Sequence, residues 1–437
     1  MNSFLCGARF ALAGLLVGVP STAARCQPGT AQSSGGDVTS PAAKVVFDPP
    51  TVSAGEQNRV LLRSAKTAWN YVKRNSSGAT GLANAVDNWK FATIWDVGSM
   101  LGALHSARGL EIISDADYRR RMDRLLQTLE TMPIYNGAAF NKKYIAATAQ
   151  MADKNDKPST EGFGWSVVDL GRFLAWMKII EQNDPVAAPA VQRVIARLDL
   201  KQLVDSAGYL LGANTDLQFN KHYDYQEGRI GYEQYAAEGL ALWGVRAERA
   251  IDFSANGTPV SVLGFRVLAD RRGDDVLTSE PFIMMGMELG WTNPIWEEQA
   301  RNVLAAQRER FKRTRIITMV SEDAIPVKPA YFYYYLVHRN GQDFVVRAPG
   351  SQPNPSYPRW ISTKAAFAWH ALFPSDYTWS AVRAVQPAGA TGAGWTGGVY
   401  ERSKRPTPSF NVNTAGIVLE AAYYAQRGCA FIKPTCP

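Results

Sequence analysis

The sequence predicts a mainly helical fold, an (α/α)6 toroid with a small β excursion, and two observations support that prediction. Long segments carry apolar residues at the three- and four-residue steps of an amphipathic or buried helix, whereas strand-like alternation is sparse. These segments alternate with long loops rich in glycine, asparagine, tryptophan, tyrosine and acidic residues. In a toroid, the starts of the inner helices point at a shared funnel, and such loops form its mouth. An irregular multi-helix bundle is the alternative architecture.

The helical segments follow one another along almost the whole chain. Helices are predicted over residues 57–74, 95–108, 115–131, 165–182, 188–196, 232–250, 279–289, 294–312, 363–372 and 414–426. Within the fourth segment, Val167, Leu170 and Leu174 recur at helical spacing. The last segment is apolar on nearly every side, so we expect it to be buried between neighbours. The best strand candidate is residues 325–338, within a β excursion predicted around residues 316–338.

The two ends of the chain differ in composition from the helical region. Residues 1–24 combine a basic residue, an apolar run too short to span a bilayer and small residues suited to cleavage, which is typical of a secretory signal peptide. Residues 25–55 contain few large apolar side chains and are predicted to be a disordered linker. The toroid is assigned to residues 56–428. In the tail, residues 429–437, Cys429 and Cys436 are close enough in sequence to form a disulfide.

Composition and charge argue against several classes of protein. The 437 residues are 46% hydrophobic, so the chain can bury a large core. The formal charge of +8 is spread along the chain without a nucleic-acid-binding motif, so no nucleic-acid partner is expected. The four histidines lack metal-ligand spacing, and no glycine cluster forms a phosphate loop. We expect no metal, no cofactor, and a periplasmic or secreted protein without a membrane-spanning segment after signal cleavage.

Acidic residues stand beside aromatic residues at several predicted helix starts. They are Asp87 with Trp89, Trp95 with Asp96, Glu161 with Trp165 and, one turn further, Asp169, Tyr232 with Glu233, Glu280 between Ser279 and Pro281, and Trp395 to Glu401 followed by Asn411 and Asn413. Sugar rings are bound by flat aromatic faces and by acids and amides, and glycosidic hydrolysis needs two carboxylates in different environments. Each place also has a structural explanation, since acids favour the first turn of any helix.

Glu233 differs from the other acids in the direction in which it points. At 100° per residue its side chain projects with Ala237, Leu240 and Gly244, on the apolar face of the helix. A helix N-terminus stabilises an ionised carboxylate, whereas a general acid needs a pKa raised by burial or by a neighbouring like charge. If this helix lines the funnel, Glu233 is a candidate general acid. Otherwise it is a base, a ligand of sugar hydroxyls or simply a first-turn helix acid.

Ordered sequence motifs give the chain a recognisable pattern. They are TGLANAVDNWKFATIWDVGSMLGAL, STEGFGWSVVDLGRFL, GYEQYAAEGLALWG, TSEPFIMMGMELG and GWTGGVYE followed by FNVNTAGIVLEAAYYAQRG. In this order they resemble a bacterial exported family of unknown function. That family looks like a glucoamylase-like (α/α)-toroid domain and is distantly similar to β-1,2-glucanases and to the glucoamylase-like domain of cyclic β-1,2-glucan synthases. The resemblance covers roughly residues 65–428 and implies the fold and the location of a site at the helix starts.

The sequence therefore predicts a carbohydrate-active protein, a glycoside hydrolase or transglycosylase acting on a bacterial glucan or exopolysaccharide through two carboxylates. We expect the catalytic residues Glu233, Asp96 and Glu161 to lie around one concave pocket. The expected substrate-binding residues, which would contact a polysaccharide or oligosaccharide, are Asp87, Trp95, Trp165, Tyr232, Tyr235, Glu280, Trp395 and Asn413. Two alternatives remain: a non-catalytic glycan-binding or exopolysaccharide-export accessory protein, and a purely structural helical scaffold.

Overall fold

The computed structural model describes residues 44–216, 221–272, 277–325, 331–337, 343–348, 351 and 354–436. The predicted signal peptide, residues 1–24, lies outside these residues, as do the first part of the predicted linker and parts of the predicted β excursion. Among the described helices, none is both long enough and apolar enough to cross a membrane.

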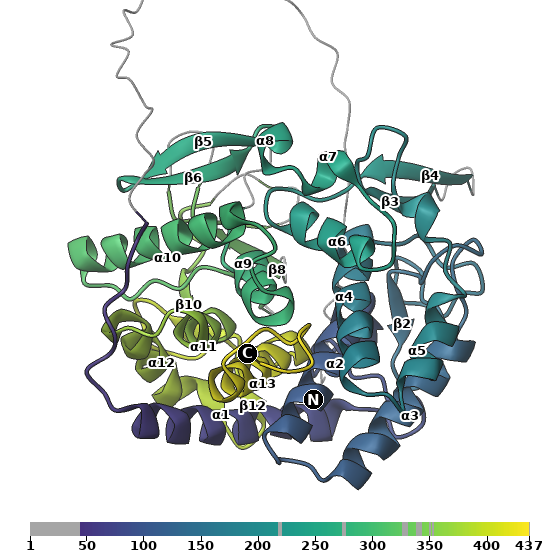
Figure 1. The fold of residues 1–437 in the computed structure, drawn as a ribbon, viewed down its shortest axis with the longest axis horizontal. Helices are drawn as coiled ribbons and strands as arrows, with labels where there is room; N and C mark the ends of the chain where they lie inside the picture. The colour runs from purple at the N-terminus through teal and green to yellow at the C-terminus, as the bar shows by residue number, and fades with distance from the viewer. Residues whose placement is uncertain are drawn as a thin grey trace, which may run out of the picture.

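The helices form two concentric rings, as the toroid prediction requires (Figure 1). The inner ring consists of α2 (Ile94–Gly109), α4 (Val167–Asn183), α6 (Tyr232–Ala241), α9 (Glu280–Met284) with its continuation as a π-helical turn η2 (Met285–Leu289), α11 (Thr363–Leu372) and α13 (Val412–Arg427). The outer ring contains α1 (Ala54–Asn75), α3 (Asp115–Thr131), α5 (Ala188–Ile195), α10 (Pro294–Thr314) and α12 (Asp376–Gly389), and the short helices α7 (Glu248–Ile251) and α8 (Phe253–Asn256) follow α6.

The apolar pattern of each helix explains its ring. In α2 every residue from Ile94 to Ala107 is buried, because outer helices and inner neighbours cover it on all sides. In α3 the buried side chains form a single stripe that includes Tyr118, Met122 and Leu125, and the opposite face carries charges in water. An inner helix such as α2 is therefore packed on every side, whereas an outer helix such as α3 is packed on one face only.

Short antiparallel sheets occupy the loops between the helices. Two pairs form hairpins, β3 (Leu211–Asp216) with β4 (Lys221–Gln226) and β5 (Gly257–Val262) with β6 (Phe265–Asp270). A three-stranded sheet joins β7 (Glu322–Ala324), β8 (Tyr331–Tyr335) and β9 (Val345–Arg347). The remaining pairs are β1 (Phe91–Thr93) with β2 (Lys143–Ile145), β10 (Trp360–Ser362) with β13 (Gly398–Tyr400), and β11 (Ala390–Thr391) with β12 (Gly394–Trp395); a 3₁₀ turn, η1, covers Leu200–Leu203.

Several boundaries differ from the predicted ones. Helix α6 ends at Ala241, well before residue 250, because Gly244 adopts the left-handed region at φ 82° and the chain turns. Helix α12 was not predicted; Pro387 lies inside it, and a capping box at Ser375 marks its start. Residues 44–53 of the predicted linker pack on the barrel, where the Phe47 ring stacks on Phe373 at 5.7 Å. No strand was predicted over either the β3–β4 or the β5–β6 hairpin.

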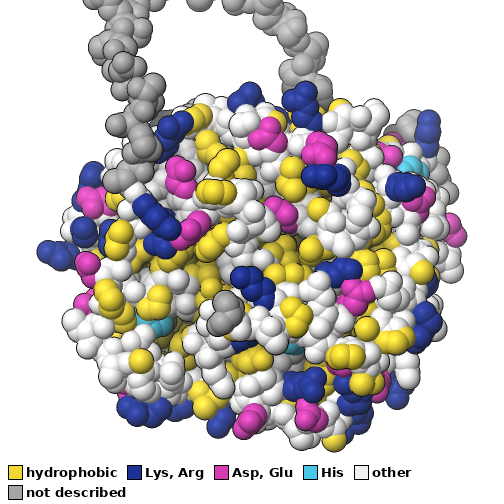
Figure 2. All heavy atoms as spheres, in the orientation of Figure 1, with side chains coloured by type: hydrophobic (Ala, Val, Ile, Leu, Met, Phe, Trp, Pro, Cys, Tyr) yellow, Lys and Arg dark blue, Asp and Glu magenta, His cyan; other side chains and the backbone are white. Residues whose placement is uncertain are grey.

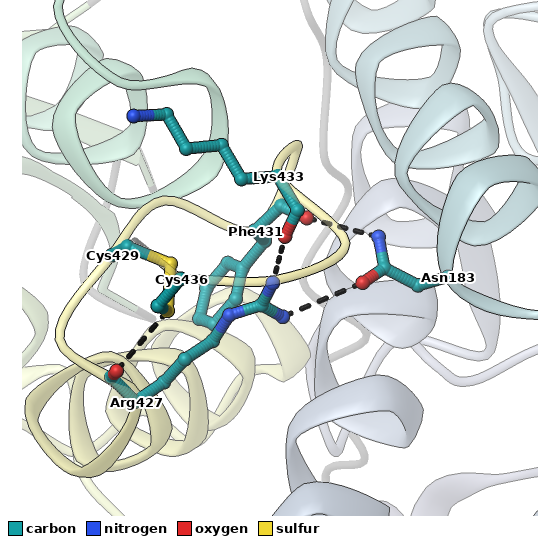
Figure 3. Close-up of a disulfide and its surroundings, with 6 residues drawn as sticks. All are labelled: Asn183, Arg427, Cys429, Phe431, Lys433 and Cys436. Atoms are coloured by element: carbon teal, nitrogen blue, oxygen red, sulfur yellow. Dashed lines mark hydrogen bonds between the residues drawn. A yellow bond between two sulfur atoms is a disulfide. The ribbon is translucent and has the colours of Figure 1, made fainter.

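The C-terminal segment packs at the end of the toroid at which the inner helices finish, where Asn183, the last residue of α4, bonds to the Phe431 carbonyl and to Arg427 (Figure 3). Cys429 and Cys436 are joined by a disulfide, and Phe431 between them is completely buried. The Phe431 ring packs against His105 of α2 and Trp176 of α4, and its N–H donates to the carbonyl of Met287. Charges of both signs are scattered over this face (Figure 2). The helix starts therefore face the opposite end.

Candidate active site

The starts of the inner helices meet at one end of the toroid around the carboxylate of Glu280, at the start of α9. Its Oε2 accepts hydrogen bonds from Nζ of Lys364 on α11 at 2.6 Å and from the hydroxyl of Tyr232 on α6 at 3.3 Å. Its Oε1 accepts from Nδ2 of Asn413 on α13 at 2.6 Å. Because Glu280 and Lys364 are both buried, the ion pair neutralises two charges that are otherwise costly to bury.

Arg172, from the second turn of α4, lies directly beneath this end of the toroid. Its Nη1 donates to Oδ1 of Asn413 at 2.6 Å and to Oγ of Ser99 at 2.8 Å, and its guanidinium lies 5.0 Å from the centre of the Trp95 ring. The Trp95 ring in turn meets Tyr232 edge-on at 5.8 Å. Arg172 can only donate, so it fixes the orientation of the Asn413 amide and aims Nδ2 at Glu280.

Two further carboxylates share the same arginine deeper in the core. Arg172 Nη2 lies 3.3 Å from an oxygen of Glu288 and 3.3 Å from an oxygen of Glu420, and all three side chains are fully buried. The Tyr235 hydroxyl donates to Glu288. Burial raises the pKa of Glu420 well above its ordinary value, and the neighbouring charge of Glu288 adds to the rise. One cation between two acids therefore favours a protonated Glu420 and an ionised Glu288.

On the α4 side, Asp169 and Glu227 form a pair of carboxylates in unequal environments. Glu227 Oε2 accepts from the backbone N–H of Val167, in the first turn of α4, at 2.7 Å, and its Oε1 accepts from the Tyr225 hydroxyl at 3.3 Å. The Glu227 carboxylate is therefore held by a backbone donor at the start of α4 and by a phenol. Burial raises the pKa of Asp169 to about 8, and the charges of Glu227 and Asp96 contribute to the rise. Asp169 nevertheless stays partly exposed.

Lys142 approaches the same pair of carboxylates from the loop before β2. Its Nζ donates to Oδ1 of Asn214 at 2.5 Å and to the Tyr225 hydroxyl at 3.0 Å. Burial lowers the pKa of Lys142, while the charges of Glu227 and Asp169 oppose that change. The ammonium lies 5.7 Å from the centre of the Phe163 ring, so donors and an aromatic ring stand together on this wall.

A second group of acids lies across the ring, between α9 and α11. Burial and the charge of Glu280 raise the pKa of Glu322 on β7 to about 7, against the opposing effects of Lys364 and of hydrogen bonds from Tyr232 and Tyr331. Like Asp169, Glu322 remains partly exposed. Burial likewise raises the pKa of the adjacent Asp323 to about 6, and its Oδ1 accepts from Nδ2 of Asn411 at 2.8 Å.

Asp96, at the start of α2, lies between these two groups. It closes a capping box with Thr93, whose hydroxyl donates to its carboxylate at 2.7 Å. Burial raises the pKa of Asp96 to about 6, and the positive charges of Arg172 and Lys364 oppose the rise. The charges that act on Asp96 therefore come from Arg172 on α4 and from Lys364 on α11. Both acidic groups thus lie near Asp96, at the same end of the funnel.

The structure brings some of the predicted site residues together and leaves others apart. Asp96, Trp95, Tyr232, Glu280 and Asn413 are part of this constellation at the helix starts. Glu161 is exposed, and its carboxylate accepts from the neighbouring Thr160 hydroxyl. Asp87 lies in the loop before β1, where its backbone N–H donates to the carbonyl of Phe410.

Glu233 occupies a different environment from the one predicted. Its carboxylate forms a two-pronged ion pair with Arg272, at 2.6 and 3.0 Å, and its side chain is fully buried. Arg272 also binds Asp270 at 2.7 Å. Burial raises the pKa of Glu233, and the ion pair with Arg272 works against that rise. A carboxylate held in this way anchors the start of α6 and is poorly placed to deliver a proton to a substrate.

Three of the predicted aromatic contacts are buried in the core. Trp165 donates through Nε1 to the carbonyl of Leu211 at 2.9 Å, and Trp395 donates through Nε1 to the carbonyl of Ser64 at 2.9 Å. Tyr235 is fully buried against Glu288. Their size and apolar surface are used for packing, which is the commoner role of large aromatic side chains.

Glu227, Glu322 and Lys142 were not among the predicted site residues. Asp169 was noted only as an acid one turn beyond Trp165. For Asp169, an acid one turn into an otherwise apolar helix was a usable signal. Glu227 directly follows the β3–β4 hairpin and Glu322 lies on a short strand, and in such places the local sequence does not indicate which side chains meet the funnel. Their significance follows only from the contacts between elements.

Residues 63–428 match the family described as a protein of unknown function, DUF3131. The chain belongs to this family. A search of curated protein sequences finds no match.

Solved structures share the fold at low sequence identity. A proposed glucoamylase from Bacteroides caccae has a TM-score of 0.61 at 13% identity, covering 85% of this chain and 94% of its own. The endo-β-1,2-glucanase from Chitinophaga pinensis, in complex with sophorotriose and glucose, has a TM-score of 0.61 at 12% identity, covering 86% and 94%. The endo-β-1,2-glucanase from Talaromyces funiculosus, in complex with sophorose, has a TM-score of 0.59 at 12% identity, covering 84% of each chain. The DUF3131 chain thus has the glucoamylase-like toroid of known glycosidases.

Proposed function

We propose that this DUF3131 protein is a glycoside hydrolase or transglycosylase that cleaves a bacterial glucan or exopolysaccharide at the starts of its inner helices. The observation that carries the proposal is the unequal pair formed by Asp169 and Glu227. Glycosidic cleavage needs one carboxyl group that is protonated near neutral pH and another that is ionised. A pKa of about 8 keeps Asp169 protonated, and the charge of the adjacent Glu227 contributes to that value.

In this proposal Asp169 is the general acid. Its proton passes to the glycosidic oxygen while the bond from that oxygen to the anomeric carbon breaks, and a second carboxylate accepts a proton from the attacking water. Glu227 keeps Asp169 protonated through its own charge. Asp96, one of the acids predicted from the sequence, adds to the same effect. Glu161 and Glu233 have no part in this arrangement, since one is exposed and the other is bound to Arg272.

The substrate class is supported by the donors and rings around the acids. Lys142, Asn413, Tyr225 and Tyr331 are partly exposed, so they can bond to hydroxyl groups, and the two tyrosines also carry aromatic rings. The likeness to β-1,2-glucanases makes a β-1,2-linked glucan the first compound to test. The disulfide of the C-terminal segment agrees with an oxidising compartment, so we also propose that the protein acts after export, in the periplasm or outside the cell.

The test is a search for released oligosaccharides. Purified protein is incubated with β-1,2-glucan, other β-glucans and bacterial exopolysaccharides, and products are separated by chromatography. We expect product from at least one glycan, and none from Asp169→Asn, which removes the proton and preserves side-chain volume. Glu298→Gln, an exposed acid on α10, is the matched control and should leave activity unchanged. A glycan that raises the melting temperature without yielding product would favour a non-catalytic glycan-binding protein.

A further inference from the structure

Glu322 is the partly exposed carboxylate on the wall opposite Asp169. The inner helices follow one another around the ring, so α4 and α11 lie on opposite sides of the toroid axis (Figure 1). Asp169 belongs to α4, whereas Glu322 interacts with Glu280 at the start of α9 and Lys364 at the start of α11. Glu227, by contrast, is bonded to the same turn of α4 that carries Asp169, so these two acids share one wall.

We propose that Glu322 is the carboxylate that activates water on the far side of the substrate, opposite the acid Asp169. The inference rests on the proposed glycosidase function and assigns its second catalytic residue. Enzymes that invert the anomeric centre hold their two carboxyl groups on opposite faces of the sugar, with room for a water molecule beside the base. A substrate bound along the axis, between α4 and α11, would place the two acids in that relationship.

The surroundings of Glu322 hold its side chain in place without neutralising it directly. The Tyr331 hydroxyl donates to its carboxylate, and the Tyr232 hydroxyl, whose single proton also serves Glu280, lies beside it. The nearby cation, Lys364, is already paired with Glu280 at 2.6 Å, and the charge of Glu280 opposes the effect of Lys364 on Glu322. Asp323 next to it is bonded to Asn411. These groups, from α6, β8, α9, α11 and β7 itself, leave a carboxylate that ionises near neutral pH, which suits a general base.

The chemical step balances with water as the only co-reactant. Water oxygen forms a bond to the anomeric carbon, and one water proton passes to the Glu322 carboxylate. The bond between the anomeric carbon and the glycosidic oxygen breaks, and the Asp169 proton passes to that oxygen. Proton exchange with solvent then restores an ionised Glu322 and a protonated Asp169.

The test is the pH profile of kcat/KM on the glycan that the wild-type protein cleaves. For wild type we expect a narrow bell with an acidic limb near pH 7, from Glu322, and an alkaline limb near pH 8, from Asp169. Glu322→Gln should lower kcat by about 10²- to 10⁴-fold, the usual contribution of a general base, and remove the acidic limb. Glu298→Gln is again the control, and thermal melting of each variant checks that it is folded.

A second variant separates catalysis from structure. Tyr331→Phe removes a hydrogen bond that favours the charged form of Glu322, so the acidic limb should move to higher pH while most of the maximal rate remains. A purely structural role of Tyr331 would not move the limb. Glu322→Gln activity within threefold of wild type, or an acidic limb removed instead by Glu227→Gln, overturns the inference alone. Failure of wild-type protein to cleave any glycan overturns the proposed function and this inference together.

Discussion

At the scale of single residues, the central carboxylates are distinguished by how their charge is balanced. Glu280 and Glu233 are fully buried, and each is bound by a cation, Lys364 and Arg272 respectively. Asp169 and Glu322 are partly exposed and lack such a direct ion pair among the described contacts, so burial and like charges raise their pKa values. The first kind holds the helix starts in place, and the second kind is available for proton transfer.

This difference predicts that Asp169→Asn stabilises the protein at neutral pH. The pKa of Asp169 is raised from 3.8 to about 8, so the folded state binds a proton that the unfolded state releases between these values. The stability contributed by this group is fully present below about pH 4 and is lost as the pH rises toward 8, by at most about 1.4 kcal/mol per pH unit. The variant should therefore melt above wild type at pH 7.5 and near it at pH 4, as measured by calorimetry. Equal differences at both pH values would contradict the assignment.

Glu233→Gln should affect stability and spare catalysis. The substitution leaves Arg272 with Asp270 alone, so we expect a loss of about 3 kcal/mol, at the lower end of the range for breaking a buried ion pair. Urea unfolding measures the loss, and turnover per folded molecule should stay within threefold of wild type. Abolished turnover in a well-folded variant would restore Glu233 as a catalytic residue.

At the scale of elements, close contact between helices α4 and α6 depends on two glycines. A Cβ on Gly239 would lie 2.1 Å from the carbonyl oxygen of Gly171, and one on Gly171 would lie 2.4 Å from the Cα of Ala236. The two backbones therefore touch, and the start of α6 stays beside Asp169. The sequence shows these glycines inside helices, where glycine costs about 1 kcal/mol relative to alanine, but not what they contact.

Gly239→Ala should consequently destabilise the protein despite its better helix propensity. The added methyl must push apart two backbones, which costs about 1–3 kcal/mol in a packed interior. Gly55→Ala in the first turn of α1 is the control, because its nearest neighbour would be a flexible arginine tip at 3.9 Å. Denaturant unfolding compares the two. A neutral Gly239→Ala would show that α4 and α6 can separate without cost.

At the scale of the whole molecule, the C-terminal segment seals the end of the toroid opposite the site. Phe431 covers the ring end near Trp176, and the Ile432 N–H donates to the carbonyl of Glu288, the acid that pairs with Arg172. The buried charge cluster therefore lies between the funnel and this closure. Loss of the closure would admit water to charges whose arrangement orients Asn413 and Glu280.

Cys429→Ser combined with Cys436→Ser tests that closure. Opening so short a loop should cost about 2–3 kcal/mol in the chain-entropy description of disulfides. Phe431→Ala should cost about 3–5 kcal/mol, because it empties a fully buried aromatic position. Thermal melting under oxidising conditions ranks the variants. A Phe431→Ala protein as stable as wild type would show that the segment does not seal the ring.

The amino-acid sequence by itself determined the mainly helical toroid, the burial of its last helix, and the spacing of the two cysteines of the disulfide. The helices follow from the local periodicity of apolar residues, and a helix that is apolar on all sides must be covered on all sides. The sequence also placed Asp96, Tyr232, Glu280 and Asn413 at helix starts, because capping and first-turn preferences are local. It could not rank the acids, since Lys364 reaches Glu280 across 84 residues and Arg272 reaches Glu233 across 39. Only the tertiary structure decided which carboxylates are neutralised and which remain open, because charge balance in a buried site is set by contacts between distant elements.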